Sequence, residues 1–313
     1  MEEKIVVGSG GEYPLNGMLT IPEEGNAPYP AVVFVHGSGS SDMDSKVYNV
    51  RPFRDLAEGL AKLGIACIRY DKRTFVYGKK MMKNPEIRKN LTVKEETIED
   101  AILAADMLRN DERIDSGRIF IAGLSMGGML APRIDDEGGN FAGLIIMAGT
   151  PRRLEVVMKD QLNEYVKTSK GLVKWIVKKQ GAKINAKFEN LYDLNDEEAK
   201  NKPVVGKSIM ALYFKDMGKK QVREYLENCS KPVLVMQGDG DFHVSVEKDF
   251  NEYKDILKDA PNATFKLYPG INHVFMPVVT GDIKKVKQEY SKPQHVVDYV
   301  INDIAEWINK QGE

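Results

Sequence analysis

A serine flanked by glycines, Ser125, lies in the stretch IFIAGLSMGG at residues 119–128. An apolar run precedes it, and Gly123 and Gly127 lie two positions before and after it. A sharp turn from a strand into a helix needs small residues at those two positions, and such a turn holds the hydroxyl clear of the backbone. The pattern also arises by chance, so Ser125 is a candidate nucleophile whose assignment depends on the residues around it.

A serine hydroxyl becomes a useful nucleophile only beside a base, and four histidines could take that role. His273, in YPGINHVF, follows the last predicted strand, so it should emerge at the same edge of the sheet as Ser125. His295 begins the final predicted helix, where a surface position is expected. His243 is expected on a loop near the site, in contact with substrate, and His36 ends the first predicted parallel strand. His273 is therefore the predicted general base.

The third member of such a group is a carboxylate that holds the imidazole in the correct tautomer. The stretch VLVMQGDGDFHVS offers Asp239 and Asp241 on the loop after another predicted strand. Both could simply form the turn, because Asp and Gly are common in turns. Asp241 is the better candidate, since it lies further out on the loop.

A serine hydrolase also needs backbone N–H groups that stabilise the developing oxyanion. The loop HGSGSSDMD, at residues 36–44, follows a predicted strand and carries glycines that let its amides turn inward. We expect the amides of Ser38 and Met126 to be the donors, and His36 and Gly37 to contact substrate. The loop lacks the lysine of a phosphate-binding GxxxxGK[ST] motif, and no GxGxxG opens a helix, so we expect no cofactor.

Short β-branched runs that alternate with helical patterns must position these residues. The runs are almost continuously apolar, as in parallel strands that helices cover on both faces. The predicted strands cover residues 30–37, 64–71, 118–123, 143–149, 232–239 and the stretch ATFKLYPG; the predicted helices cover Phe53–Leu63, Val93–Arg109, Met126–Ile134 and the C-terminal HVVDYVINDIAEWI. The pattern predicts an α/β fold with a mostly parallel central sheet flanked by helices, and an antiparallel hairpin in the first thirty residues at the sheet edge.

One region interrupts this alternation. Residues 151–229 show several helical patterns and no convincing strand, with 17 Lys and Arg against 11 Asp and Glu. We expect them to form a helical cap inserted into a core made of residues 1–150 and 230–313. Its positive charge is either an ordinary solvated surface or an attraction for anionic substrates.

A second, smaller insertion at residues 74–92 also follows a predicted strand. It should hang over the edge of the sheet where open α/β sheets bind their ligands. We expect Tyr77, Met81 and Met82 to line the substrate pocket there.

The composition limits the function classes. A net charge of −1 over 313 residues argues against a general nucleic-acid binder, and no apolar run is long enough for a membrane span. The acidic start MEEK does not resemble a secretory signal, and Cys67 and Cys229 are expected as reduced thiols, so we expect a cytoplasmic protein. With four histidines and no zinc-type spacing, no metal site is expected. A homo-oligomer is compatible with the sequence.

The motifs HGSG, YDKR, GLSMGG, GDGD and GINHVF occur in the order and at the spacings of the α/β-hydrolase superfamily, and the resemblance covers almost the whole chain. The order Ser125, Asp241, His273 is that of this superfamily. Within it, the chain resembles bacterial EstD-like carboxylesterases and serine-aminopeptidase-like hydrolases with an inserted helical cap. Ser40, Met43 and Thr74 stand where that branch usually has proline, arginine and glycine.

The resemblance implies hydrolysis of a small carboxylic ester through an acyl-enzyme on Ser125. A thioesterase, or an acyl-peptide hydrolase or aminopeptidase, would use the same residues, because cap and loops select the scissile bond. An aminopeptidase would need acidic residues placed to bind a free amino terminus, and the positive cap disfavours it. A small-molecule-binding protein without activity would normally have lost one of the three residues.

Overall fold

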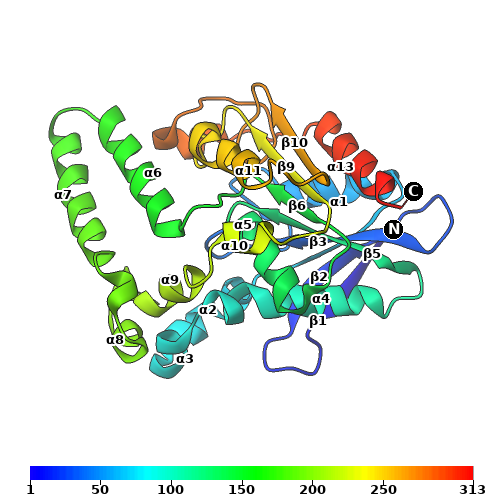
Figure 1. The fold of residues 1–313 in the computed structure, drawn as a ribbon, viewed down its shortest axis with the longest axis horizontal. Coiled ribbons are helices and arrows are strands. Elements are labelled where there is room, and N and C mark those ends of the chain that lie inside the picture. Colours follow the sequence, from blue (N-terminus) through cyan, green and yellow to red (C-terminus); the bar gives the residue numbers. More distant parts are fainter. Residues whose placement is uncertain (313) are drawn as a thin grey trace.

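The computed structural model describes residues 1–312 and contains, within them, a central sheet of eight strands in the order β1-β2-β4-β3-β5-β6-β9-β10 (Figure 1). The strands from β4 to β10 pair in parallel, whereas β1–β2 and β2–β4 pair antiparallel. The mostly parallel sheet and the N-terminal hairpin at its edge are therefore confirmed. The strands are β1 (Glu2–Val7), β2 (Leu15–Thr20), β3 (Tyr29–Val35), β4 (Ala66–Tyr70), β5 (Ile114–Leu124), β6 (Leu144–Met147), β9 (Val233–Gly238) and β10 (Ala263–Tyr268).

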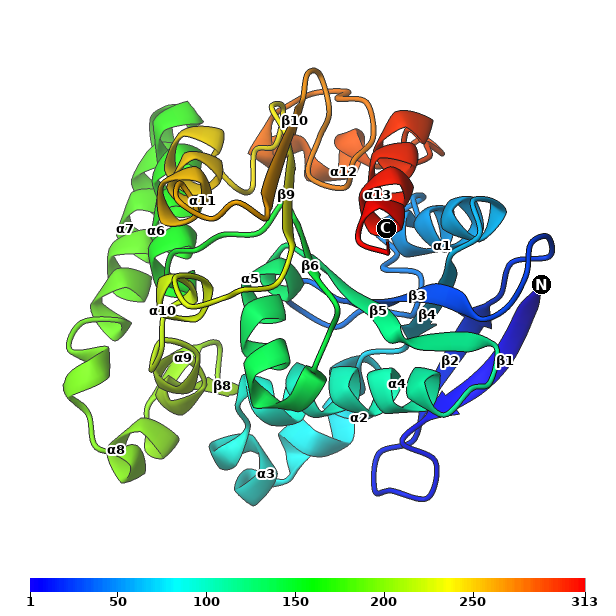
Figure 2. The same cartoon turned by 45° about the vertical axis from the view of Figure 1, so that its right-hand side comes forward.

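Helices cover both faces of the sheet (Figure 2). Alternate residues of the inner strands point to opposite faces, as the period of a strand requires: Val33 packs with one cluster and Phe34 with the other. On one face lie α1 (Pro52–Lys62) and α13 (Asp298–Lys310), and on the other α4 (Glu99–Arg109), α5 (Met126–Ile134) and α11 (Asn251–Ile256). The continuous apolar strands of the sequence are thus explained by burial on two sides.

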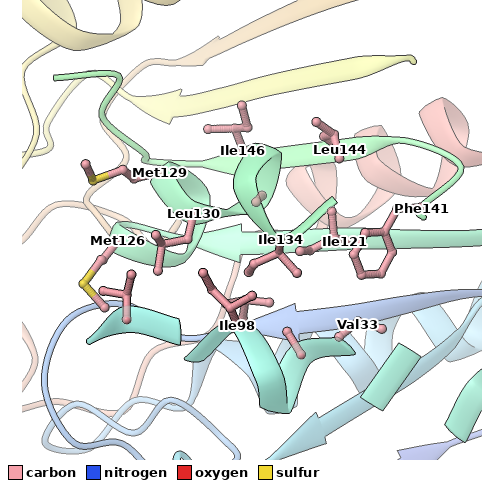
Figure 3. Packing of buried hydrophobic residues seen from close by; sticks show 14 of the residues in the cluster. Val33, Ile98, Ile121, Met126, Met129, Leu130, Ile134, Phe141, Leu144 and Ile146 are labelled. Carbon is pink, nitrogen blue, oxygen red and sulfur yellow. The ribbon is translucent and has the colours of Figure 1, made fainter. Parts of the chain in front are cut away.

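The face that carries α5 shows how the sheet fixes the start of this helix. Leu130 and Ile134 of α5 belong to the same buried cluster as Ile121 of β5 and Ile146 of β6 (Figure 3). Each such fully buried side chain contributes about 1.5–3 kcal/mol relative to exposure. This packing holds the first turn of α5 rigidly at the carboxyl end of β5.

The segment between β6 and β9 leaves the sheet. It forms the outer part of the molecule on the left of Figure 1, with α7 at the edge. Its elements are α6 (Leu154–Thr168), α7 (Gly171–Lys187), α8 (Asp196–Asn201), β7 (Pro203–Val205), β8 (Ile209–Met210), α9 (Ala211–Met217) and α10 (Val222–Leu226). The expectation that it contains no strand is wrong, because β7 and β8 form a short antiparallel pair. A ladder of two or three residues leaves almost no alternating pattern for a sequence analysis to detect.

The 74–92 insertion folds into two helices, α2 (Arg73–Lys83) and α3 (Pro85–Asn90), and α3 lies against α8, β8 and α9 of the larger insertion. The remaining turns are a π-helical turn at Lys94–Ile98 that leads into α4, two more at Asp135–Gly139 and Val246–Phe250, 3₁₀ turns at Leu191–Asp193 and Ile283–Lys285, and α12 (Val286–Glu289). No helix within residues 1–312 is both long and apolar enough to cross a bilayer.

Candidate active site

Ser125 occupies the single residue between the end of β5 and the start of α5. Its backbone has φ 58° and ψ −117°, a conformation that costs free energy for any residue with a Cβ. A Cβ on Gly123 would lie 2.1 Å from the carbonyl oxygen of Gly127, and one on Gly127 would lie 2.2 Å from that of Val35. Only glycine fits either position, which is the physical reason for the spacing seen in the sequence.

The loops after β9 and β10 bring Asp241 and His273 together. His273 Nδ1 lies 2.7 Å from Asp241 Oδ2. The other carboxylate oxygen of Asp241 accepts hydrogen bonds from the backbone amides of His243 and Val244, at 2.7 and 3.1 Å. The carboxylate is completely buried and held in one orientation. A donor on Nδ1 leaves Nε2 of His273 with a free lone pair, which is the form that a general base needs.

Asp239, the competing carboxylate, serves the loop and not the imidazole. Its Oδ1 accepts the backbone N–H of Gly270 at 2.6 Å, and its own amide donates to the carbonyl of Tyr268. It therefore ties the β9 loop to the turn that leads to His273. The two aspartates have separate structural surroundings although they are two residues apart.

Ser125, Asp241 and His273 follow β5, β9 and β10, whose parallel pairing places all three at the carboxyl edge of the sheet. Within residues 1–312, the Ser125 hydroxyl has no hydrogen-bond partner. The contact between a nucleophile and its base is often long without substrate and tightens in the complex. The hydroxyl is thus unengaged at the edge that also carries the imidazole.

Two backbone amides beside Ser125 are also unengaged. In the described part of the chain, neither Ser38 N nor Met126 N donates a hydrogen bond to another residue. Both residues line the same cavity as Ser125, and the Ser38 loop runs so close that a Cβ on Gly37 would lie 3.2 Å from Ser125 Cβ. Met126 N also belongs to the first turn of α5, whose positive dipole end favours negative charge. Gly37 thus contributes the close approach of its backbone and no side chain.

A buried ion pair packs against this loop and was not predicted from the sequence. Lys72, at the end of β4, is 2% exposed; its ammonium donates to the Gly37 carbonyl at 2.9 Å and lies 3.3 Å from Glu96 Oε1. Glu96 also accepts hydrogen bonds from the hydroxyls of Thr74 in α2 and Tyr213 in α9. The pair therefore connects the Ser38 loop to both insertions. The YDKR motif was the available signal, but it does not indicate which residue Lys72 would pair with.

The cavity at Ser125 has a volume of about 580 Å³. Its walls come from the Ser38 loop, α2, α6, β8 and α9, and apolar side chains such as Leu154, Met158 and Phe214 form much of them. Its charged lining residues are Lys79 and Glu96. This volume and apolar character are typical of a pocket for a small organic molecule.

Two expected substrate contacts lie outside the cavity. His36 is buried between Phe53 and Tyr70, with Nε2 3.0 Å from the carbonyl of Asp42, because its side chain points into the core and not toward Ser125. Tyr77 turns toward the N-terminal hairpin and donates its hydroxyl to the carbonyl of Pro14 at 2.7 Å. The assignment of both residues to the pocket is wrong.

The other residues of the 74–92 insertion divide by their position on α2. Gly78, Lys79 and Met82 line the cavity at Ser125, whereas Met81 points to a separate hollow beside the N-terminal hairpin. One face of α2 is therefore the one that meets the pocket. The sequence could not fix which face that is.

His243 lies beside His273 and does not line the cavity at Ser125. Its ring is 4.8 Å from that of His273, and burial together with the charge that His273 would carry lowers the pKa of His243 to about 4. The lowered pKa leaves the His243 imidazole uncharged at neutral pH. No group of three or more His, Cys, Asp or Glu within residues 1–312 is arranged to hold a metal ion.

Comparison with known proteins gives a family. The family model described as serine aminopeptidase, S33, matches residues 26–277. Esterase EstD of Thermotoga maritima is 35% identical to the chain over 309 residues, which are 99% of this chain and 68% of that protein.

Solved structures agree on the fold. Est1E from Butyrivibrio proteoclasticus has a TM-score of 0.55 at 16% identity, with 98% of each chain covered. The Pyrococcus furiosus esterase Pf2001 has a TM-score of 0.58 at 16% identity, with 99% of this chain and 91% of that chain covered. At such identities these structures establish the fold alone. The chain therefore has the α/β-hydrolase fold that its motifs predicted, and it belongs to the serine aminopeptidase S33 family.

Proposed function

We propose that the chain is a carboxylesterase-type serine hydrolase whose catalytic residues are Ser125, His273 and Asp241. The observation that carries the proposal is the oriented pair of His273 and Asp241 at the sheet edge where a strained turn presents Ser125. The 35% identity to an esterase over nearly the whole chain supports the same reaction class. We further propose that residues 151–229 act as a cap over a core of residues 1–150 and 230–313.

The reaction proceeds in two halves. Ser125 Oγ attacks the ester carbonyl carbon while His273 Nε2 accepts its proton, and the amides of Ser38 and Met126 hold the oxyanion. Collapse of the tetrahedral intermediate expels the alcohol, which takes the proton from His273. Water then gives a proton to His273 and attacks the acyl-enzyme, and Ser125 recovers its proton as the acid departs. Asp241 keeps the imidazole in the required tautomer and stabilises its charged form.

The lining of the cavity favours an ester over a peptide with a free amino terminus. Such a peptide would bring an ammonium group that needs an available carboxylate. Glu96 is the carboxylate of the lining, and Lys72, Thr74 and Tyr213 already occupy its oxygens. An ester acyl group needs only the apolar walls.

A panel of p-nitrophenyl esters of increasing acyl length tests the proposal. Ser125→Ala should lower kcat about 10⁶-fold, since nucleophile and base act as a unit. Ser208→Ala is the matched control, because Ser208 lines the same cavity from the larger insertion. It should keep activity within a few-fold of the wild type.

Two results would contradict the proposal. Full activity of Ser125→Ala, or labelling of another residue by a serine-directed fluorophosphonate, would remove Ser125 from the mechanism. Amino-acid p-nitroanilides turned over with a higher kcat/KM than every ester would instead place the chain among the aminopeptidases.

A further inference from the structure

Helix α7 exposes large apolar side chains in its N-terminal half. Leu172 is 72% exposed, Val173 54% and Trp175 59%, and Ile176 is exposed as well. These four residues lie within five consecutive positions of one helix. On a protein surface, such a concentration of exposed apolar side chains marks a binding site for another protein or for a membrane.

The same helix is strongly basic. Residues 165–188 contain seven lysines and no Asp or Glu, although the chain as a whole has a net charge of −1. Within residues 1–312, six of these lysines make no ion pair, and five of the six are exposed: Lys170, Lys174, Lys178, Lys179 and Lys183. The ammonium of Lys179 lies 5.0 Å from the centre of the Trp175 ring, so charge and apolar surface are intermixed.

Helix α7 is attached to the rest of the molecule mainly through its C-terminal half. Gly181 packs so closely on Leu162 of α6 that a Cβ would lie 2.6 Å from it, and Phe188 is buried against Phe214 of α9. In the N-terminal half every residue from Gly171 to Ile176 is exposed, and α7 forms the outer edge of the molecule (Figure 1). The exposed apolar residues are therefore not needed for the packing of the insertion.

We propose that α7 is a docking surface for an anionic lipid bilayer, on which it lies with Leu172, Trp175 and their neighbours among the headgroups. Exposed Trp and Leu side chains surrounded by lysines fit the interface of a membrane that carries negative charge. The charge excludes a second copy of this chain as the occupant, because two α7 helices placed face to face would bring five lysines against five. The positive charge of α7 is complementary to a surface of phosphate headgroups.

Helix α6 links the proposed docking surface to the cavity. It packs on α7 and contributes Leu154, Val157 and Met158 to the lining at Ser125. If the proposed esterase function holds, apolar esters dissolved in the bilayer are expected substrates. Membrane binding itself does not depend on catalysis and is measured without turnover.

The full chain is mixed with vesicles of phosphatidylglycerol and phosphatidylcholine in equal parts, and with vesicles of phosphatidylcholine alone. Trp175 is exposed and the other tryptophan, Trp307, is buried, so a blue shift of the emission reports Trp175 entering the bilayer surface. We expect the shift and co-sedimentation with anionic vesicles at low salt, and their loss at high salt.

Variants separate the two parts of the surface. Lys179→Gln with Lys183→Gln should weaken binding about 30-fold, because both lie on the same side of the helix as Leu172 and Ile176 and each lysine near an anionic surface is worth about a factor of five. Leu172→Ser with Ile176→Ser should abolish the blue shift. The matched controls are Lys62→Gln with Lys310→Gln and Leu103→Ser, at exposed positions of α1, α13 and α4, and they should bind like the wild type.

The outcomes distinguish this proposal from its rivals and from the esterase proposal. No binding to anionic vesicles, or equal binding to both kinds of vesicle, would overturn it. A concentration-dependent dimer that Leu172→Ser dissociates, without lipid binding, would show that α7 binds a second copy. All α7 variants should hydrolyse p-nitrophenyl acetate like the wild type in buffer without vesicles, which shows that they are folded.

Discussion

Hydrogen bonding gives Asp239 and Asp241 different expected effects on catalysis. Asp241→Asn keeps the size of the side chain but removes the charge that stabilises the imidazolium, and it favours the wrong tautomer of His273. We expect kcat for p-nitrophenyl esters to fall about 10⁴-fold. Asp239→Asn is the matched control and should lower kcat by less than about tenfold, since within residues 1–312 its carboxylate accepts a hydrogen bond from the Gly270 amide and not from His273. The opposite order of effects would exchange the two assignments.

Individual residues differ in how far the sequence could place them. Ser125, Asp241 and His273 were predicted from strand ends and loop positions, because parallel strands bring their carboxyl ends to one edge. His36 was misplaced because a residue at a strand end can point into either face, and only the packing against Phe53 decides which. Glu96 was missed because its partners come from segments that are remote in sequence.

The turn between β5 and α5 depends on the absence of a side chain at Gly123. Gly123→Ala would place a methyl group on the Gly127 carbonyl, and relief of this overlap must move the turn that holds Ser125. We expect a loss of stability of about 1–3 kcal/mol or more in urea denaturation, together with a loss of esterase activity.

Gly78→Ala is the control for this substitution. Gly78 lies inside α2, and the contact nearest to its Cβ would be Thr74 at 3.7 Å, an ordinary van der Waals distance. Alanine there should stabilise the helix by about 0.5–1 kcal/mol. If Gly123→Ala unfolds at the same urea concentration as the wild type, the turn does not need glycine.

Whole elements were predicted well where their pattern is long and continuous. The parallel strands and α1, α4, α5 and α13 agree with the predicted ranges to within a few residues, although the predicted helix at Val93–Arg109 begins with a π-helical turn. The short pair β7–β8 could not be predicted, because its hydrogen bonds depend on how the insertion folds back on itself. The periodicity of apolar residues indicates a helix or a strand only when it repeats over several residues.

A buried ion pair connects the start of the larger insertion to the turn at Val246–Phe250, which follows β9. Arg152, two residues before α6, donates to both oxygens of Asp249 at 2.7 and 2.9 Å, and Asp249 is fully buried. Arg152→Met would leave this carboxylate with only Thr150 and Ser245 as partners. We expect a loss of about 3–5 kcal/mol in the free energy of unfolding, measured in urea.

Arg223→Met provides the comparison for this pair. Arg223 faces Glu227 on the exposed side of α10, where both side chains are more than 40% accessible. Solvent weakens such a pair, so the loss should stay below about 1 kcal/mol. Equal losses in the free energy of unfolding for the two substitutions would mean that the Arg152 pair does not stabilise the attachment of the insertion.

Stability of the whole molecule should depend on pH through His36. Burial lowers the pKa of His36 from its ordinary value of 6.5 to about 3, so between these values the unfolded chain binds a proton that the folded chain does not. This contribution to stability is complete above pH 6.5 and is lost as the pH falls toward 3, by about 1.4 kcal/mol per pH unit.

His36→Gln removes this titration and can still donate a hydrogen bond to the Asp42 carbonyl. Urea denaturation at pH 7, 6 and 5 should show the wild type losing stability faster than the variant, and between pH 6 and pH 5 the wild type should lose about 1.2 kcal/mol more than the variant. His243, whose pKa is lowered to about 4, titrates in both proteins and cancels in the difference. Parallel curves for wild type and His36→Gln would show that His36 is not held neutral by burial, and its place in the core would then need to be revised.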